Sequence, residues 1–468
     1  MLHILLFIIY IALIIAVIFI ERKSPTEALL WVFVMICIPY LGAVLYLVFG
    51  STMSIKITAY IRKKRLQKRY RPHVLPKVPE RSAEISDEDY DVIRFNSVYN
   101  RSRITSCDTA DIYTCGKDHY TSLFEDIKNA EECIYIEFYT IHHDMVGEAL
   151  VEALAKKAEQ GVKVLVMCDF IANLSTPKKM FEPLVRAGGE VIRVKPYLTH
   201  YRSHRKIVVI DHKIAYIGGM NIGKQYANMD KVKTPWRDTQ VRLTGECAAS
   251  LEDYFLSDWL CAVKRRDWES AAEYSESIKR PKYGFNKDNL CQFIIGGVDT
   301  DRESVKMCYL SMIRSAKKSI RIQTPYFIPD ASILDALKTA AATGINIEIM
   351  VPGIKASFFL DPVTNYYCGQ LMEHGAKVYK YRGYIHAKTM VVDDEICCIG
   401  SVNMDMRSLM VDDEVCGVFY KNEMAGEYIE IFDNDIKSCD EYEWDDFALR
   451  GRKAKIMESI FLLFAPLM

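Results

Sequence analysis

The same octet of residues occurs twice in this chain, as HRKIVVID from His204 to Asp211 and as HAKTMVVD from His386 to Asp393. Each copy carries His, Lys and Asp at the same spacing and leads into a run of apolar residues. Solenoid repeats recur every 20 to 50 residues or so, and these two copies are much farther apart. The duplication therefore predicts two copies of a whole domain in a chain of 468 residues, which is too long for one ordinary core.

The segments before the two octets also repeat in order. In the first half, CIYIEFY is a predicted strand, a helix ends at Gly161, and KVLVMC is the next strand. In the second half, SIRIQTPYF, a helix that ends at Gly344, and NIEIMV follow the same order. Alternating strands and helices indicate an α/β fold. The sequence predicts a first lobe over residues 92–280 and a second lobe over residues 286–468.

The amino end is apolar. Met1–Ile20 contains no charged side chain, and a second apolar run covers Ala28–Phe49. At 1.5 Å per residue, about 20 helical residues cross the roughly 30 Å hydrocarbon core of a bilayer. No basic residue precedes the first run and no small-residue cleavage site follows it, which argues against a signal peptide. The sequence predicts a two-helix transmembrane hairpin over residues 1–50.

Residues 51–91 form a basic juxtamembrane segment and a linker. The segment has no acidic residue between Ser51 and Pro79, and its basic residues include Lys56, Arg62, Lys63, Lys64, Arg65, Lys68, Arg69 and Arg71. The positive-inside rule then places the amino terminus and both lobes in the cytoplasm, with two spans in the cell membrane. Basic residues near an anionic leaflet gain about 1 kcal/mol each, so we expect anionic membrane lipids as partners rather than a solvated flank.

Each octet presents an imidazole and an ammonium group together. His204 and Lys206 lie two residues apart at the start of a predicted strand, so both side chains leave the same face, and His386 and Lys388 do likewise. A neutral imidazole can act as nucleophile or proton carrier, and a lysine stabilises negative charge on a phosphate oxygen. These four residues are therefore candidate catalytic groups.

The octet aspartates complete the motif, and we group Asp211 and Asp393 with the catalytic candidates. Each lies an odd number of positions after its histidine and at the end of the predicted strand. This position favours fixing the turn, or supporting another residue, over contact with substrate.

Further polar residues follow each octet at matched positions. They are Gly219, Asn221 and Asp238 in the first half, and Ser401, Asn403 and Glu414 in the second. A hydroxyl or an amide can bind a phosphate oxygen, so Asn221, Ser401 and Asn403 are candidate substrate-binding residues. A carboxylate can orient an imidazole, which makes Asp238 and Glu414 candidate supporting residues. Gly219 takes the position of the serine.

This pattern resembles the phospholipase D superfamily, whose hallmark is a duplicated H-x-K-x4-D followed by G-[GS]-x-N. Within it the chain is most similar to the bacterial cardiolipin synthases, on the segments PTEALLWVFVMICIPYLGAVLYLVFG, IQTPYFIPD, NMDMRSL and ESIFLLFAPL. The resemblance implies a duplicated phospholipase D-like domain, with two mixed-sheet α/β lobes about a pseudo-dyad and both histidines between them. One departure is Asp412-Asp413-Glu414, where the family usually has Asn-Phe-Glu.

The resemblance also implies a mechanism. His204 would be the nucleophile that forms a phosphatidyl-histidine, and His386 the general acid and then general base, although the sequence allows the reverse. Phosphatidylglycerol would be both donor and acceptor, giving cardiolipin and glycerol. The lysines and asparagines would hold the phosphate, so neither a cofactor nor a metal is required. The nearest metal-like group, His142-His143-Asp144, lacks spaced partners. Tyr139 and Tyr326 occupy like positions in the two repeats and either line the lipid site or pack in the core.

Other functions remain open on the sequence alone. Water in place of the lipid acceptor would give a phospholipase D-type hydrolase, and serine would give another phosphatidyltransferase. A nuclease is a further alternative because the basic segment could bind a phosphate backbone. Its position beside a predicted membrane span argues against nucleic acid as a partner. A membrane-tethered scaffold would need no octets.

Overall fold

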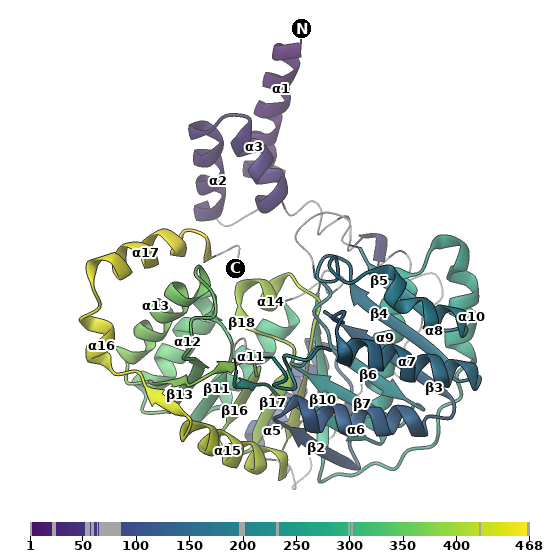
Figure 1. The fold of residues 1–468 in the computed structure, drawn as a ribbon. Coiled ribbons are helices and arrows are strands. Elements are labelled where there is room, and N and C mark those ends of the chain that lie inside the picture. Colours follow the sequence, from purple (N-terminus) through teal and green to yellow (C-terminus); the bar gives the residue numbers. More distant parts are fainter. Residues whose placement is uncertain are drawn as a thin grey trace.

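The computed structural model describes residues 2–20, 25–51, 57, 60–62, 64, 86–195, 202–230, 234–297, 300, 303–420 and 423–465. The apolar amino end folds into α1 (Leu2–Ile15), a π-helical turn (Ala16–Ile20), α2 (Pro25–Cys37), α3 (Leu41–Leu45) and a second π-helical turn (Tyr46–Gly50). These helices project from the rest of the molecule (Figure 1). Among the described residues, no helix combines the length and the apolar character needed to cross a bilayer. The transmembrane hairpin therefore stays a prediction. Most of the basic segment lies outside the described residues, apart from Arg62 and Lys64.

The first octet belongs to a mixed seven-stranded sheet, in the order β2-β9-β7-β6-β3-β4-β5. Strands β3, β4 and β5, at one end of this order, are parallel, and the other neighbours pair antiparallel. The bounds are β2 (Thr109–Tyr113), β3 (Cys133–Phe138), β4 (Lys163–Asp169), β5 (Glu190–Val194), β6 (Ile207–Ile210), β7 (Ile214–Gly218) and β9 (Gln240–Thr244).

The second octet belongs to a mixed nine-stranded sheet, in the order β1-β10-β19-β17-β16-β11-β13-β14-β20. Its strands β16 and β17 form a hairpin whose first strand lies within the octet, as β6 and β7 do in the first sheet. The bounds are β1 (Ile104–Ser106), β10 (Leu290–Gly296), β11 (Ser319–Gln323), β13 (Asn346–Pro352), β14 (Lys377–Tyr381), β16 (Thr389–Val392), β17 (Ile396–Gly400), β19 (Glu414–Tyr420) and β20 (Cys439–Glu441).

Two short parallel pairs complete the strands. β12 (Phe327–Ile328) pairs with β18 (Met404–Asp405), and β15 (Tyr384–Ile385) pairs with β8 (Trp236–Arg237). The second pair joins the two halves of the chain, because β8 follows the first octet and β15 directly precedes the second. It therefore brings the region around Asp238 close to His386.

The two sheets share one core and are covered by helices on their outer faces. Side chains alternate along each strand, so Ile134 and Ile136 pack under the outer helices while Tyr135 joins the core shared by both sheets. The helices of the first half are α6 (Gly116–Asn129), α7 (Met145–Glu159), α8 (Glu182–Arg186), α9 (Glu246–Ala262) and α10 (Trp268–Ser277). Those of the second are α11 (Ser304–Ser315), α12 (Ala331–Ala342), α13 (Leu360–Met372), α14 (Met406–Met410), α15 (Glu423–Ile436), α16 (Trp444–Ala448) and α17 (Arg452–Leu462). This arrangement agrees with the predicted duplicated α/β fold of two mixed-sheet lobes.

The start of the range predicted for the first lobe lies with the second sheet instead. Helix α5 (Asp87–Val98) buries Val92 and Ile93 in the core beneath α11, and β1 extends the edge of the nine-stranded sheet by pairing with β10. The chain thus contributes to the second lobe before it enters the first. The sequence of a short edge strand does not indicate which of two sheets the strand joins.

Candidate active site

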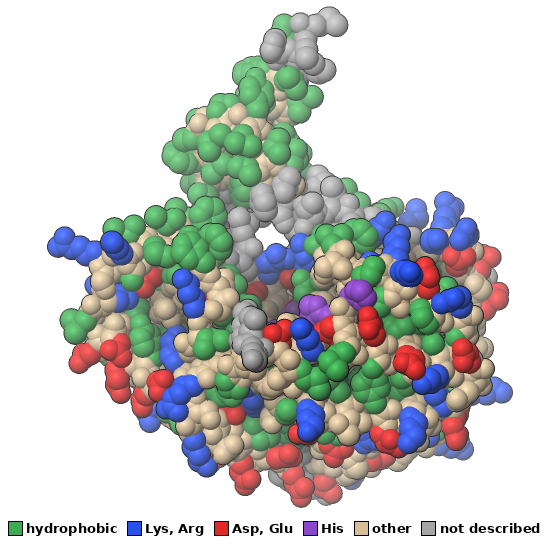
Figure 2. All heavy atoms as spheres, viewed as in Figure 1, with side chains coloured by type: hydrophobic (Ala, Val, Ile, Leu, Met, Phe, Trp, Pro, Cys, Tyr) green, Lys and Arg blue, Asp and Glu red, His purple; other side chains and the backbone are tan. Residues whose placement is uncertain are grey.

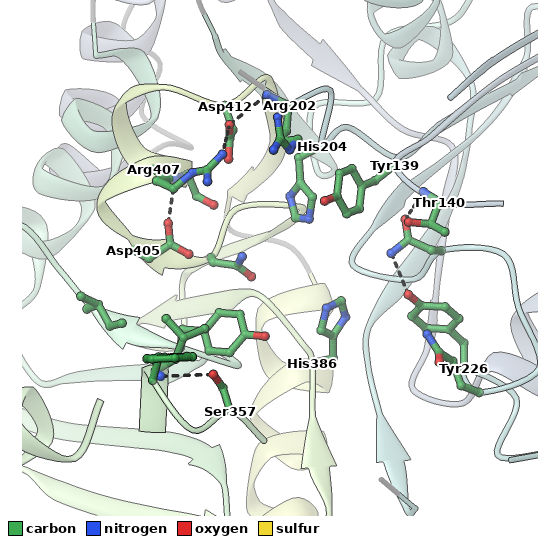
Figure 3. Close-up of a pocket in the computed structure, with 18 of the residues that line it drawn as sticks. Tyr139, Thr140, Arg202, His204, Tyr226, Ser357, His386, Asp405, Arg407 and Asp412 are labelled. Atoms are coloured by element: carbon green, nitrogen blue, oxygen red, sulfur yellow. Dashed lines mark hydrogen bonds and ion pairs between the residues drawn. The ribbon is translucent and has the colours of Figure 1, made fainter. Parts of the chain in front are cut away.

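Both octet histidines line one cavity between the two halves. His204 lies shortly before β6 and His386 shortly before β16, so the two matched hairpins place both histidines at the same cavity. The cavity has a volume of about 670 Å³. Figure 3 shows the two imidazoles facing it from separate strand ends. The predicted meeting of the two histidines is therefore present in the structure.

Each imidazole is bound by a buried acid from the other half of the chain. Nδ1 of His204 lies 2.8 Å from Oε1 of Glu414, and Nδ1 of His386 lies 2.6 Å from Oδ2 of Asp238. Both acids are almost fully buried. A hydrogen bond at Nδ1 fixes the ring orientation and leaves Nε2 as the nitrogen that can act on a substrate.

Backbone hydrogen bonds between the halves explain this exchange of acids. The amide of His204 donates to the carbonyl of Asp413 at 2.9 Å, and the amide of His386 donates to the carbonyl of Arg237 at 2.6 Å. Each histidine is thus bonded to the residue directly before the acid that orients it. Glu414 follows Asp413, and Asp238 follows Arg237, so these backbone bonds place each carboxylate against its imidazole.

The two octet lysines are buried beside the histidines. The ammonium of Lys206 donates to the carbonyl of His204 at 2.6 Å and lies 5.5 Å from the centre of the Tyr139 ring. The ammonium of Lys388 donates to the carbonyl of His386. Burial lowers the pKa of Lys206 to about 7 and that of Lys388 to about 8. Two partly desolvated ammonium groups next to the imidazoles suit a negatively charged substrate.

Burial and the lysine charges also keep both imidazoles neutral. They lower the pKa of His386 to about 3 and hold the pKa of His204 well below its usual value. Burial raises the pKa of Glu414 to about 7. For Asp238 burial acts in the same direction, but the interaction with His386, which includes a hydrogen bond, and the charge of Lys388 outweigh it and hold the pKa below its usual value. The two imidazole–acid pairs therefore differ: Asp238 is the more firmly ionised acid.

The two predicted asparagines both line the cavity. Asn221 is held on both sides of its amide: Oδ1 accepts from the amide of Thr140 at 3.1 Å, and Nδ2 donates to the hydroxyl of Tyr226 at 2.9 Å. Oδ1 of Asn403 is buried and has no hydrogen-bond partner among the described residues. The unsatisfied group of Asn403 is thus an acceptor, and only its Nδ2 can donate to a phosphate oxygen.

Ser401 and Gly219 serve the acids rather than the cavity. The hydroxyl of Ser401 is fully buried, donates to Glu414 and accepts from the amide of Val415 at 3.1 Å. We predicted this hydroxyl as a phosphate ligand, but its position makes it a support for Glu414. At Gly219 an added Cβ would come within 2.2 Å of Oδ1 of Asp238. Glycine is therefore needed where the other half has serine, because the carboxylate occupies that space.

The octet aspartates lie away from the cavity, so they do not belong with the groups that touch substrate. The carboxylate of Asp211 accepts from the amides of Glu131, Glu132 and Cys133. Asp393 accepts in the same way from Lys317, Lys318 and Ser319. Their φ angles of 49° and 53° are in the left-handed region, which Asp tolerates better than most residues. Each lies at the opposite end of its strand from the histidine, and each fixes the turn there.

The cavity wall also contains the two tyrosines that the repeats place at like positions, and two arginines. Tyr139 and Tyr326 line the cavity, and the Tyr139 ring lies edge-on to His204 with ring centres 4.8 Å apart. Arg202 and Arg407 also line it, and Arg407 pairs with Asp412 at 3.2 Å. Figure 3 shows these charged groups beside His204. Arg407 falls in the NMDMRSL segment, which could have indicated it, whereas nothing in the spacing singles out Arg202.

One group of possible metal ligands lies within the described residues. It is near the turn between β6 and β7 and not at the cavity. It consists of Cys133, His212 and Glu252. His212 Nδ1 lies 2.5 Å from Glu252, whose other oxygen accepts from Arg280 at 2.5 Å. The guanidinium of Arg280 on the Glu252 carboxylate thus already supplies the positive charge that a metal ion would bring. In the motif His142-His143-Asp144, the aspartate instead caps α7 by accepting from the amide of Val146 at 3.0 Å.

Two neutral imidazoles on one cavity, each oriented by a buried acid and accompanied by a lysine, define a phosphodiester-transfer site of the phospholipase D type. A family described as "Cardiolipin synthase, PLD-like domain" matches residues 123–259 and 309–436, and a family described as "Phospholipase_D-nuclease N-terminal" matches residues 8–51. The chain belongs to the cardiolipin synthase family of the phospholipase D superfamily, whose members are enzymes.

Known proteins support this assignment over the whole chain. The major cardiolipin synthase ClsA of Bacillus subtilis is 34% identical over 99% of this chain and 98% of its own length. A cardiolipin synthase of Clostridium perfringens strain SM101 is 35% identical over 96% of each chain. The crystal structure of phosphatidylserine synthase from Haemophilus influenzae superposes with a TM-score of 0.62 at 16% identity, covering 80% of this chain and 97% of that one. That likeness concerns the fold.

Proposed function

We propose that this protein makes cardiolipin by transferring the phosphatidyl group of one phosphatidylglycerol to a second, with release of glycerol. The observation that carries the proposal is the pair of histidines on one cavity, each bound at Nδ1 by an acid from the other half. A displacement at phosphorus needs a nucleophile on one side and a proton donor on the other, and one octet could not supply both.

The reaction proceeds in two displacements. In the first, Nε2 of His204 attacks phosphorus while His386 donates a proton to the departing glycerol oxygen, giving a phosphatidyl-histidine. In the second, His386 takes the proton from a terminal hydroxyl of another phosphatidylglycerol, the hydroxyl oxygen attacks phosphorus, and the bond to His204 breaks. Lys206, Lys388, Asn221 and Asn403 hold the phosphate oxygens, so the steps use side chains of this chain alone.

The electrostatics favour His386 over His204 as the proton carrier. A general acid must hold a proton, and the ionised Asp238 stabilises a protonated imidazole at His386. A bound phosphate adds negative charge beside the two lysines that now lower the pKa of His386, so this pKa rises in the complex. Glu414, with a pKa of about 7, supports a positive charge on His204 less strongly.

The proposal includes a membrane location. Residues 1–50 form a two-span hairpin, and the lobes lie on the cytoplasmic side with the basic segment at the anionic lipid surface. Its support is the uncharged Met1–Ile20 and the large apolar side chains that the amino-terminal helices expose. Among them are Ile8, Phe19, Leu29 and Phe33, each more than half exposed. Both lipid substrates then reach the cavity from the bilayer.

The test uses the full chain with labelled phosphatidylglycerol in mixed micelles, comparing the wild type with His204→Ala, His386→Ala and the surface control His374→Ala. We expect cardiolipin and glycerol from the wild type and the control, and a loss of at least about 10²-fold in both octet variants. Rapid quenching of His386→Ala should capture label on His204, located by mass spectrometry. Phosphatidic acid as the only product would make the protein a hydrolase and overturn the proposal.

A further inference from the structure

The carboxyl-terminal helix α17 (Arg452–Leu462) is apolar on two sides, and only one of them is packed. On the packed side, Phe461, Leu462 and Ala465 join a small core with Ile328 and Val363 next to α13. This contact fixes the helix on the second lobe. The sequence allowed either packing or contact with a membrane interface, and the packed side accounts for only part of the apolar residues.

The other side of the helix is exposed. Ile456 and Ile460 on α17, and Leu463 and Phe464 in the turn directly after it, are 59%, 48%, 63% and 50% exposed, and their spacing is that of one helical face. Four large apolar residues at this spacing form a continuous strip, unlike the single exposed apolar residues that any protein surface carries.

The exposed charges on α17 itself are positive. Arg452, Lys453 and Lys455 are all exposed in the first turn of α17. The one acid of the helix, Glu458, is buried and accepts from Nε of Arg450 at 2.8 Å. The helix therefore offers an exposed apolar face with basic side chains at its beginning, which is the pattern of helices that lie in a membrane interface.

The packed side of α17 reaches the rim of the catalytic cavity through Phe461. The ring of Phe461 lies 5.4 Å from that of Phe358 and 5.1 Å from that of Phe359, measured between centres. Both phenylalanines are more than half exposed, and Phe359 also lines the cavity. In Figure 1 α17 lies on the side of the molecule from which the amino-terminal helices project, and Figure 2 shows apolar surface on that side.

We propose that the exposed face of α17 together with Phe358 and Phe359 is a docking surface for an anionic phospholipid bilayer, and that it holds the mouth of the cavity against the lipid. The inference rests on the proposed function, because the cavity must receive a lipid headgroup whose acyl chains stay in the membrane. The basic first turn selects an anionic lipid surface over another protein. The contact of Phe461 with Phe359 joins α17 to the apolar rim of the cavity, which gives the acyl chains an apolar path.

The first test compares activity in two settings. The triple variant Ile456→Ser/Ile460→Ser/Leu463→Ser and a control of equal size, Val98→Ser/Leu174→Ser/Val185→Ser, change exposed apolar residues only. With phosphatidylglycerol in vesicles, we expect the α17 variant to lose about tenfold or more in kcat/KM, and in detergent mixed micelles to stay within about twofold of the wild type. The control should match the wild type in both. Unchanged activity on vesicles would overturn the docking surface.

A second measurement does not depend on turnover. In vesicles that contain brominated phosphatidylglycerol, the added fluorescence of Ile460→Trp should be quenched more strongly than that of Val98→Trp. Equal quenching would overturn the docking surface even if the enzyme is active. Quenching without any cardiolipin synthesis would keep the docking surface and reject the proposed function. If α17 instead joins two copies of the chain, the triple serine variant would become monomeric in detergent and Ile460→Trp would show no extra quenching.

Discussion

His204 and Glu414 come from different halves of the chain, yet Nδ1 of the histidine lies 2.8 Å from Oε1 of the acid. Asp238 makes the reciprocal contact with His386. Neither half therefore contains a complete imidazole–acid pair. The duplication therefore does more than repeat a lobe. Each lobe supplies the acid that completes the imidazole–acid pair of the other. Packing of the two halves is consequently a condition for orienting either imidazole.

Replacement of Glu414 by Gln should separate orientation from charge. The amide keeps the size of the side chain but cannot stabilise a positive imidazole, so we expect kcat to fall about 10²- to 10⁴-fold with little change in KM. Product assays on mixed micelles measure both constants. Ser401→Ala removes only a supporting hydrogen bond and should cost about tenfold or less. A kcat for Glu414→Gln within a factor of two of the wild type would contradict this role.

The octet aspartates should affect stability and not chemistry. Each carboxylate accepts three backbone N–H groups at a turn. Asp393→Asn should lower the free energy of unfolding by about 1 to 3 kcal/mol, because it weakens these charge-assisted hydrogen bonds. Denaturant unfolding measures the change, and the kcat of the folded enzyme should match the wild type. A hundredfold loss of kcat without a loss of stability would show that the residue takes part in catalysis.

The lysines predict how activity depends on pH. The pKa of Lys206 is about 7 and that of Lys388 about 8, and each binds phosphate in the charged form that exists below its pKa. As pH rises through these values the charge is lost, so kcat/KM should fall between about pH 7 and 9. A bound phosphodiester stabilises the ammonium groups, so the fall in kcat at saturating substrate should occur at higher pH. A kcat/KM that stays flat to pH 10 or so would contradict the assignment.

Arg62 extends the active-site region into the basic segment. Its guanidinium lies 2.8 Å from Asp413, whose carbonyl holds the amide of His204, and both side chains are buried. Arg62→Met should destabilise the protein by about 3 kcal/mol and reduce kcat, because it leaves a buried carboxylate poorly compensated. The double variant Arg62→Met/Asp413→Asn should recover most of the stability in thermal unfolding. The exposed Lys64→Met is the control, and equal effects of Arg62→Met and Lys64→Met would reject the coupling.

Asp412 and Asp413, where the chain departs from the family pattern, make different contacts in the structure. Asp412 pairs with Arg407 on the cavity wall, and burial raises its pKa to about 7. Asp413 turns away from the cavity toward Arg62 and Arg205, with its carboxylate 3.8 Å from the latter. The first substitution therefore bears on the substrate, and the second on the position of the strand that carries Glu414.

The sequence by itself determined the duplicated α/β fold, the two His-Lys pairs and the residues that follow them, because strand alternation and fixed spacing are local properties of the chain. The tertiary structure alone decided which acid orients which histidine, that Ser401 supports Glu414, and that α5 and β1 join the second sheet. It also decided the contact between Arg62 and Asp413. These relationships join residues far apart in the chain, and they depend on how the two halves pack. No local pattern encodes that packing, since each half could satisfy the same spacing in several arrangements.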